Sequence, residues 1–229
     1  ARAVLRAADD FEDAAKALSE PLSGDFHLGL IPTISPYLLP HIMGPLGAEL
    51  PKVNFYLHEN QTHVLLQELD EGKLDVVILS WLDSIENVER YNLYSEPLVL
   101  AAPRDQPLAK LSEASLKDLD GQLVLTLEDG HCLRDETLDY CFTAGAREDQ
   151  RFQATSLETL RYMVASGLGI TLMPQLAVRS ADEEQGLHYV PFGSPPPSRE
   201  ICLLVRPNYS RMEAVRAMVA CIRQAMSPL

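Results

Sequence analysis

Short apolar runs alternate with helix-patterned runs through most of this sequence, and the alternation restricts the fold more than any other feature. Strand-like runs occur at 25–31, 52–59 and 74–80, and apolar residues at helical spacing fill 35–50 and 61–72 between them. Strands that alternate with helices are typical of a parallel sheet covered by helices on both faces. We therefore expect an α/β fold.

A second series of the same kind follows the first. Its expected strands are 96–103, 121–127, 150–155 and 170–174, and its expected helices are 133–144 and 155–169. Thr155 and Glu158 predict a capping box at the start of the second helix. A last strand and helix are expected at 199–207 and 211–226. Two α/β series in 229 residues predict two lobes, with a ligand cleft between them at the carboxyl ends of strands.

Charge and composition exclude several classes of protein. The net charge of −14 indicates a surface that repels phosphate backbones, so the chain is a poor direct DNA binder. No apolar run approaches the roughly 18 residues that a membrane span needs, and no signal-peptide pattern is visible. We therefore expect a cytoplasmic protein that binds no membrane. Gly-rich phosphate loops and a nucleophile elbow are absent, so no cofactor and no enzyme activity are expected.

Two of the four cysteines, Cys132 and Cys141, stand at opposite ends of one expected helix. Without a secretory signal the thiols are expected to be reduced, and a disulfide in such a protein is typically catalytic or redox-sensing. Nine helical residues separate the two Cα atoms by about 13–14 Å and turn the side chains about 180° apart. A disulfide requires Cα atoms within roughly 4.4–6.8 Å. The helix must therefore unwind before these two thiols can bond.

Cys132 has the surroundings of a reactive thiol. The N-terminus of a helix presents positive backbone dipoles, and Arg134 and His131 stand beside this cysteine in the sequence. Positive surroundings favour the thiolate, which is the form that attacks a peroxide oxygen.

The other cysteines favour an ordinary packing role. Cys141 is expected with Leu138 and Phe142 on the apolar face of its helix, as a buried and inert thiol. Cys202 in a strand and Cys221 in the last helix are expected to be small buried hydrophobes. No zinc site is expected, because there is no C-x-x-C pair and thiols on opposite helix faces cannot share one tetrahedral ion.

Four stretches of the sequence resemble peroxide-sensing LysR-type transcriptional regulators. They are "GLIPTISPYLLPH" (29–41), "QTHVLLQELDEGKLDVVIL" (61–79), "LEDGHCLRDETLDYCFTAGA" (127–146) and "ATSLETLRYMVASGLGITLMP" (154–174). The resemblance extends from about Leu22 to near Arg206, and more loosely to the end of the chain. Its most specific part is "GHCLRD" followed by a second cysteine nine residues after the first.

This resemblance implies a regulatory domain with a periplasmic-binding-protein-like fold, made of two Rossmann-like lobes joined by two crossovers near 90–98 and 197–202. Lobe I would comprise 24–94 and 200–229, and the redox-active lobe II would comprise 95–199. Residues 1–20 read as a helix closed by Pro21 and would be the end of a linker helix. A winged helix-turn-helix DNA-binding domain would precede it.

The resemblance also implies roles for individual residues. Cys132 would be the peroxidatic, sensing cysteine and Cys141 the resolving one. Three residues match positions that bind peroxide and relay its proton: Thr33, Thr62 and His131. Three more match charged neighbours that stabilise the thiolate: Arg199, Arg134 and Asp135.

The implied mechanism is oxidation of Cys132 to a sulfenic acid and its condensation with Cys141 to a disulfide. This change would alter the packing of a dimer and move its DNA-binding heads, which would activate antioxidant genes. The implied partners are a homodimer of regulatory domains within a full-length tetramer, DNA through the preceding domain, RNA polymerase, and glutaredoxin or thioredoxin as reductant.

Three alternatives stay open at this point. A metabolite-binding LysR-type domain would hold a small effector between its lobes and leave the thiols silent. A peroxidase would consume peroxide in the steady state. A periplasmic solute-binding protein shares the two-lobe architecture but would work in another compartment.

Overall fold

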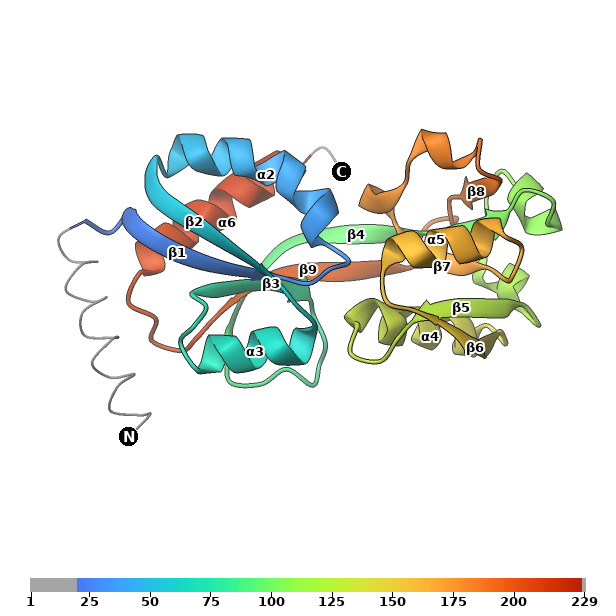
Figure 1. The fold of residues 1–229 in the computed structure, drawn as a ribbon, viewed down its shortest axis with the longest axis horizontal. Coiled ribbons are helices and arrows are strands. Elements are labelled where there is room, and N and C mark those ends of the chain that lie inside the picture. Colours follow the sequence, from blue (N-terminus) through green and yellow to red (C-terminus); the bar gives the residue numbers. More distant parts are fainter. Residues whose placement is uncertain (1–19, 228–229) are drawn as a thin grey trace. The chain divides into compact units, whose positions relative to one another are not determined.

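The computed structural model describes residues 20–227, and these residues form two compact units (Figure 1). Unit 1 comprises 20–94 and 200–227, and unit 2 comprises 95–199. The chain passes from one unit to the other twice, within β4 (Glu89–Pro103) and within β9 (Ser198–Val205). The helix expected at 1–20 lies outside the described residues.

Unit 1 is built on a four-stranded sheet. Its strand order is β2 (Lys52–Glu59), β1 (Ser23–Leu30), β3 (Val76–Ser80) and β9. β1 runs parallel to both β2 and β3, as the strand–helix alternation predicted, but β9 is antiparallel to β3. The parallel arrangement predicted for the first three strands is therefore confirmed, and the direction of β9, which joins this sheet from the far end of the sequence, was not predicted.

Helices cover both faces of the unit 1 sheet. Figure 1 shows α2 (Ser35–Glu49) and α6 (Met212–Met226) on one face and α3 (Thr62–Asp70) on the other. The close packing of α3 depends on Gly29 in β1. A Cβ atom at this position would lie 2.8 Å from Leu74 Cδ1 and 3.0 Å from Leu65 Cδ2, which is closer than side-chain atoms pack.

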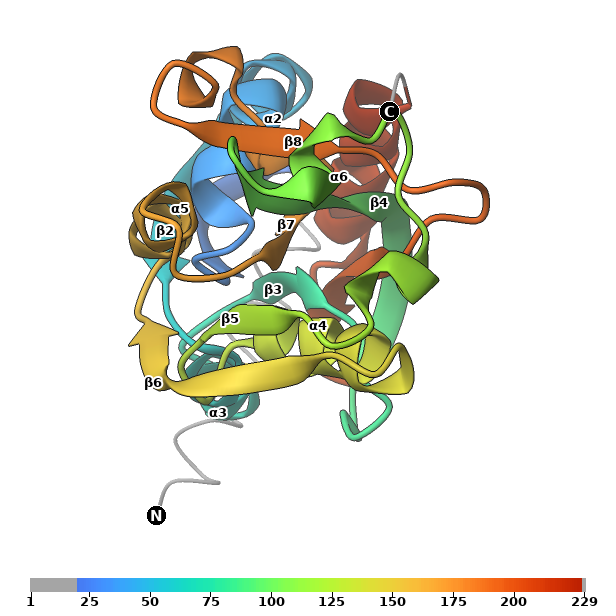
Figure 2. The same cartoon turned by 90° about the vertical axis from the view of Figure 1, so that its right-hand side faces the viewer.

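Unit 2 contains two smaller sheets (Figure 2). β4 pairs antiparallel with β7 (Thr171–Pro174) and with β8 (Leu187–Val190). β5 (Leu123–Leu127) pairs in parallel with β6 (Arg147–Ala154). β8 is the short run "LHYV", and it agrees with the strand-like pattern around His188 in the sequence.

Two α-helices and four short 3₁₀ helices complete unit 2. α4 (Cys132–Thr143) follows β5, and α5 (Leu157–Ala165) follows β6. The 3₁₀ helices are η1 (Pro107–Lys110), η2 (Leu116–Leu119), η3 (Gln175–Ala177) and η4 (Ser180–Asp182). The N-cap of α5 is Ser156, whose Oγ accepts a hydrogen bond from the Thr159 amide at 3.2 Å. The predicted capping box with Thr155 is therefore wrong by one residue.

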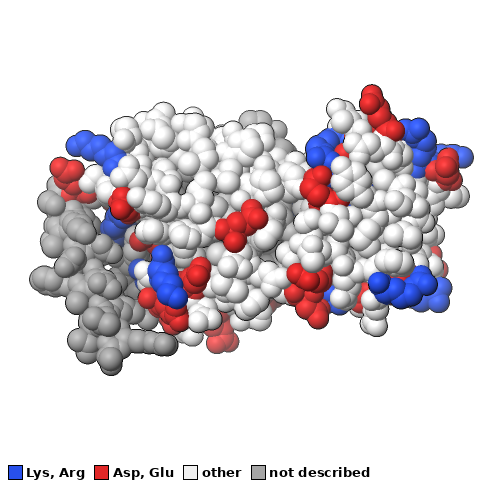
Figure 3. Space-filling model, viewed as in Figure 1, with Lys and Arg blue, Asp and Glu red and all other residues white. Residues whose placement is uncertain are grey.

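The surface of the described residues agrees with the acidic composition. On the face drawn in Figure 3, the basic side chains of these residues are dispersed among acidic ones and form no broad basic patch. Within residues 20–227, no helix is both long and apolar enough to cross a membrane.

Candidate functional site

The first turn of α4 contains Cys132, the residue for which the resemblance predicts a sensing role. β5 ends at Leu127, the chain turns through Gly130 with a φ of 95°, and His131 is the extended N-cap residue. The helix begins at Cys132 itself, one residue before the predicted start at 133. The Cys132 thiol therefore belongs to the turn of the helix where the unpaired backbone N–H groups are.

Both cysteines of α4 are buried, and neither is in a disulfide. The exposed fraction is 2% for Cys132 and 1% for Cys141. Because α4 is one continuous helix from Cys132 to Thr143, the nine-residue rise separates the two Cα atoms by about 13.5 Å. The structure thus shows the dithiol state, in which the pair cannot bond.

Cys141 lies in a strongly desolvating environment. Burial raises the pKa of its thiol to about 12. Leu138 is buried beside it on the same face, whereas Phe142 is 53% exposed. The expectation that Phe142 lies on the apolar face is wrong, because the buried face of α4 runs through Leu133, Thr137, Leu138 and Cys141.

His131 is buried and uncharged at neutral pH. Burial lowers the pKa of its imidazole, and the Glu128 carboxylate, whose Oε1 lies 4.0 Å from His131 Nε2, opposes that shift only in part. The sequence suggested that His131 adds positive charge beside the thiol. The structure instead provides a neutral ring that can donate or accept one proton.

Arg134 lies among carboxylates. Its guanidinium is 3.0 Å from Glu148, 3.3 Å from Asp129 and 3.7 Å from Asp135. Partial desolvation raises the pKa of Asp135, and the Arg134 charge acts in the opposite direction. The contacts described for Arg134 thus share its charge among three acids, and its action on the thiol stays a prediction.

Arg199 lies at the start of β9 in a buried ion pair. Its Nη2 and Nε are 2.8 and 2.9 Å from Glu96 Oε2, and both side chains are 1% exposed. The other oxygen of Glu96 accepts a hydrogen bond from the Leu176 amide at 3.0 Å. A direct role of Arg199 at the thiol also stays a prediction.

Thr33 and Thr62 belong to unit 1, whereas the remaining candidate residues belong to unit 2. Both threonines are buried, with exposed fractions of 2% and 9%. The sequence alone also allows Thr33 and Thr62 to be plain helix N-caps. The N-cap residues of α2 and α3 are Ile34 and Gln61, so neither threonine occupies that position.

Sequence reasoning missed one contact of α4. The Tyr140 hydroxyl donates a hydrogen bond to the Ser198 carbonyl at 3.0 Å, and the Ser198 amide lies 3.3 Å from the same hydroxyl. The two residues are 58 positions apart, and no local pattern pairs them. In the sequence, only the position of Tyr140 directly before Cys141 marks this tyrosine as a residue of interest.

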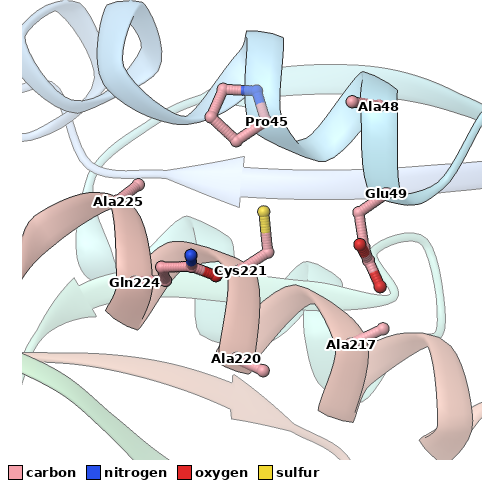
Figure 4. Close-up of a pocket in the computed structure, with 8 residues that line it drawn as sticks. All are labelled: Pro45, Ala48, Glu49, Ala217, Ala220, Cys221, Gln224 and Ala225. Carbon is pink, nitrogen blue, oxygen red and sulfur yellow. The ribbon is translucent and has the colours of Figure 1, made fainter.

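The two remaining cysteines lie away from α4. Cys202 is buried in β9, its thiol lies 3.3 Å from Asn92 Oδ1, and burial raises its pKa to about 11. Cys221 is only half-buried, contrary to expectation, because it lines a groove of about 540 Å³ between α2 and α6 (Figure 4). Among residues 20–227, no group of three or more His, Cys, Asp or Glu side chains is arranged to hold a metal ion.

Comparison with known proteins identifies the class of this domain. The family model described as the LysR substrate binding domain matches residues 19–227. The chain therefore belongs to the LysR substrate-binding domain family, whose two-lobed α/β fold the sequence predicted.

Its relatives within this family include OxyR. The DNA-binding transcriptional dual regulator OxyR of Escherichia coli strain K12 is 47% identical over 226 residues, which cover 99% of this chain and 74% of that protein. A hydrogen peroxide-inducible genes activator of Haemophilus influenzae is 44% identical over 223 residues, which cover 96% of this chain and 74% of the relative. These relatives are transcriptional regulators and not enzymes.

Solved structures of relatives include both redox forms. The crystal structure of the oxidised form of OxyR matches with a TM-score of 0.84 and 48% identity over 91% of this chain and 98% of that chain. The reduced form matches with a TM-score of 0.83 and 45% identity over 90% of this chain and 98% of that chain. The fold is thus similar to both forms, and the dithiol state of this chain is seen in α4, where Cys132 and Cys141 are not joined in a disulfide.

Proposed function

We propose that this chain is the regulatory domain of a peroxide-sensing LysR-type transcription activator, in which hydrogen peroxide joins Cys132 and Cys141 in a disulfide. One observation carries the proposal. In a relative of OxyR, two buried cysteines that are not joined in a disulfide stand nine residues apart in one continuous helix, which keeps their Cα atoms too far apart to bond. Such an arrangement couples thiol chemistry to a change of backbone conformation.

The chemistry needs one peroxide molecule and no cofactor. The Cys132 thiolate attacks one oxygen of hydrogen peroxide, the O–O bond breaks, and a sulfenic acid and hydroxide form; the hydroxide takes up a proton to become water. Cys141 sulfur then attacks the sulfenic sulfur, the S–O bond breaks, and the second oxygen leaves as water. Two thiols and one peroxide thus give one disulfide and two waters.

The positions of the two thiols support this division of roles. With its pKa near 12, Cys141 stays protonated at neutral pH and is a poor first nucleophile. Cys132 occupies the first turn of α4, where backbone dipoles favour an anion. The neutral His131 ring at the N-cap is suited to move the proton that leaves the thiol or the peroxide.

The remaining assignments rest on the family resemblance. Thr33 and Thr62 would hold peroxide together with His131, and Arg199, Arg134 and Asp135 would tune the thiolate. Lobe I would be 24–94 with 200–229 and lobe II 95–199, preceded by the linker helix at 1–20 and a winged helix-turn-helix domain. The protein would work in the cytoplasm as a homodimer within a tetramer, with DNA, RNA polymerase, and glutaredoxin or thioredoxin as partners.

Peptide-mapped mass spectrometry tests the proposal. The reduced chain is treated with one equivalent of hydrogen peroxide, quenched by alkylation and digested. We expect a rapid loss of two hydrogens that maps to a Cys132–Cys141 disulfide. Cys132→Ser abolishes it, Cys141→Ser leaves a sulfenic acid on Cys132, and Cys202→Ser behaves as the wild type. Four free thiols after several minutes would refute the proposal and favour a regulator that binds a small effector.

A further inference from the structure

The Tyr140 hydroxyl hydrogen-bonds to both backbone polar groups of Ser198, the first residue of β9. It donates to the Ser198 carbonyl at 3.0 Å and accepts from the Ser198 amide at 3.3 Å. Tyr140 directly precedes the resolving cysteine on α4, and Ser198 directly precedes Arg199 on β9. This pair of hydrogen bonds, which we call the Tyr140 clamp, therefore links the redox helix to β9.

The segment that the clamp holds is the one by which the chain leaves unit 2. The boundary between the units falls between Arg199 and Glu200. The adjacent residues also contact β4, since the Leu98 amide donates to the Pro197 carbonyl at 2.8 Å and Glu96 pairs with Arg199 at 2.8 Å. The start of β9 is thus held by both β4 and α4.

We propose that Tyr140 is a positioning residue that couples the redox state of α4 to the start of β9 and stabilises the dithiol form. The inference rests on the proposed function, since it concerns the same disulfide. It assigns a role to a hydroxyl that hydrogen-bonds to the Ser198 backbone.

Geometry makes the clamp and the disulfide compete. Bonding requires the Cα atoms of Cys132 and Cys141 to approach from about 13.5 Å to within roughly 6.8 Å. Tyr140 is covalently next to Cys141 and must move with it. We therefore expect the hydroxyl to release Ser198, so that forming the disulfide frees the segment that leads to unit 1.

Loss of the clamp stabilises the disulfide relative to the dithiol. A neutral hydrogen bond of this kind shifts an equilibrium by about two- to tenfold. Tyr140→Phe keeps the ring and removes both bonds, so the equilibrium constant for oxidation rises by about three- to tenfold. By the Nernst relation this corresponds to a reduction potential about 14 to 30 mV more negative. The potential is measured by alkylation and mass spectrometry after equilibration in thiol–disulfide buffers.

Tyr162→Phe is the matched control, because it removes a tyrosine hydroxyl from an exposed position on α5 of the same unit. We expect its potential to equal that of the wild type. Urea unfolding of the reduced forms shows whether Tyr140→Phe remains folded.

Hydrogen exchange of the Ser198 amide separates coupling from a merely structural role. In the reduced wild type this amide is protected by the Tyr140 hydroxyl, and oxidation should release it. Tyr140→Phe should exchange it quickly in both redox forms. Cys132→Ser cannot form the disulfide. Adding Tyr140→Phe to it should release the Ser198 amide for fast exchange without any oxidation.

The outcomes are distinguishable. A wild-type chain that forms no Cys132–Cys141 disulfide overturns the proposed function together with this inference. A wild-type chain that forms the disulfide, with Tyr140→Phe matching its potential and its Ser198 exchange, overturns the coupling role of Tyr140 alone.

Discussion

The thiols of Cys132 and Cys141 are equally buried, and their positions along α4 give them different chemistry. Cys132 lies in the first turn beside the neutral ring of His131, whereas Cys141 lies nine residues on, where only desolvation acts on its pKa. Desolvation favours the neutral thiol, and helix dipoles favour the anion. These positions support the proposal that Cys132 reacts first and Cys141 second.

Alkylation of the native reduced chain measures this difference. At pH 8 only about one part in ten thousand of a thiol with a pKa near 12 is thiolate, so iodoacetamide should modify Cys141 extremely slowly. Its rate should still rise tenfold per pH unit above pH 9, whereas in urea it should approach that of a free cysteine. Equal native rates for Cys141 and the half-buried Cys221 would contradict the account.

The buried His131 makes stability depend on pH. Because its pKa is lower in the folded chain than the unfolded value of about 6.5, the unfolded state binds more protons below that value. The stability contributed by the neutral ring is present above pH 6.5 and is lost as the pH falls through the folded pKa. His131→Gln should flatten the unfolding free energy between pH 7 and 5, whereas exposed His63→Gln should not. An unchanged slope in His131→Gln would exclude the buried neutral ring.

Among the helices, α5 shows how local structure departs from a sequence pattern. Ser156 has extended dihedral angles and caps the helix through its Oγ, although Thr155 and Glu158 suggested a capping box one residue earlier. Both positions carry a hydroxyl, and the burial of Leu157 and Leu160 decides where the helix begins. Propensity selects the residue type, and packing selects the register.

Paired substitutions test the cap. Ser156→Ala should cost about 1 kcal/mol of unfolding free energy, because an amide of the first turn loses its acceptor. Thr155→Ala, at an exposed position, should stay within about 0.5 kcal/mol of the wild type. Urea unfolding followed by circular dichroism gives both values, and the reverse order would restore the capping box predicted from the sequence.

A buried ion pair fixes the segment after α5. Arg161 of α5 bonds to Asp182 of η4 and donates to the Ala177 carbonyl at 2.8 Å, and the Tyr189 hydroxyl of β8 donates to Asp182 at 2.6 Å. Burial raises the pKa of Asp182, but the hydrogen bonds and positive charges around it together lower the pKa by more, so the net shift is downward.

Removing one charge of that pair should destabilise unit 2. Asp182→Asn keeps the shape but removes the buried counter-charge of Arg161, and the expected loss is about 3 kcal/mol. Glu158→Gln is the control, because its half-exposed carboxylate also pairs with Arg161 but in contact with water. Comparable losses in urea unfolding of the two variants would contradict the buried pair's role.

At the scale of the whole molecule, the sequence predicted the α/β class and most helices and strands, because periodicity reports which residues are buried. It did not predict that β9 runs antiparallel to β3, since periodicity carries no strand direction. β4 begins at Glu89, seven residues before the predicted start at 96. The sequence pattern missed these residues because they are mostly exposed.

The candidate site was predictable only where its residues are neighbours in sequence. His131, Cys132 and Cys141 follow from one motif and one helix. The Tyr140 clamp and the Glu96–Arg199 pair join segments 58 and 103 residues apart, and only folding brings those segments together. Long-range pairs of this kind carry no local signature.

Hydrogen exchange with mass spectrometry, measured before and after one equivalent of peroxide, shows whether the disulfide opens α4. We expect oxidation to remove protection from the amides of residues 133–141 and to leave α5 unchanged. In Cys132→Ser we expect peroxide to leave the protection of α4 intact. A Cys132–Cys141 disulfide formed with the protection of α4 intact would contradict the account, because the two Cα atoms cannot approach while that helix stands.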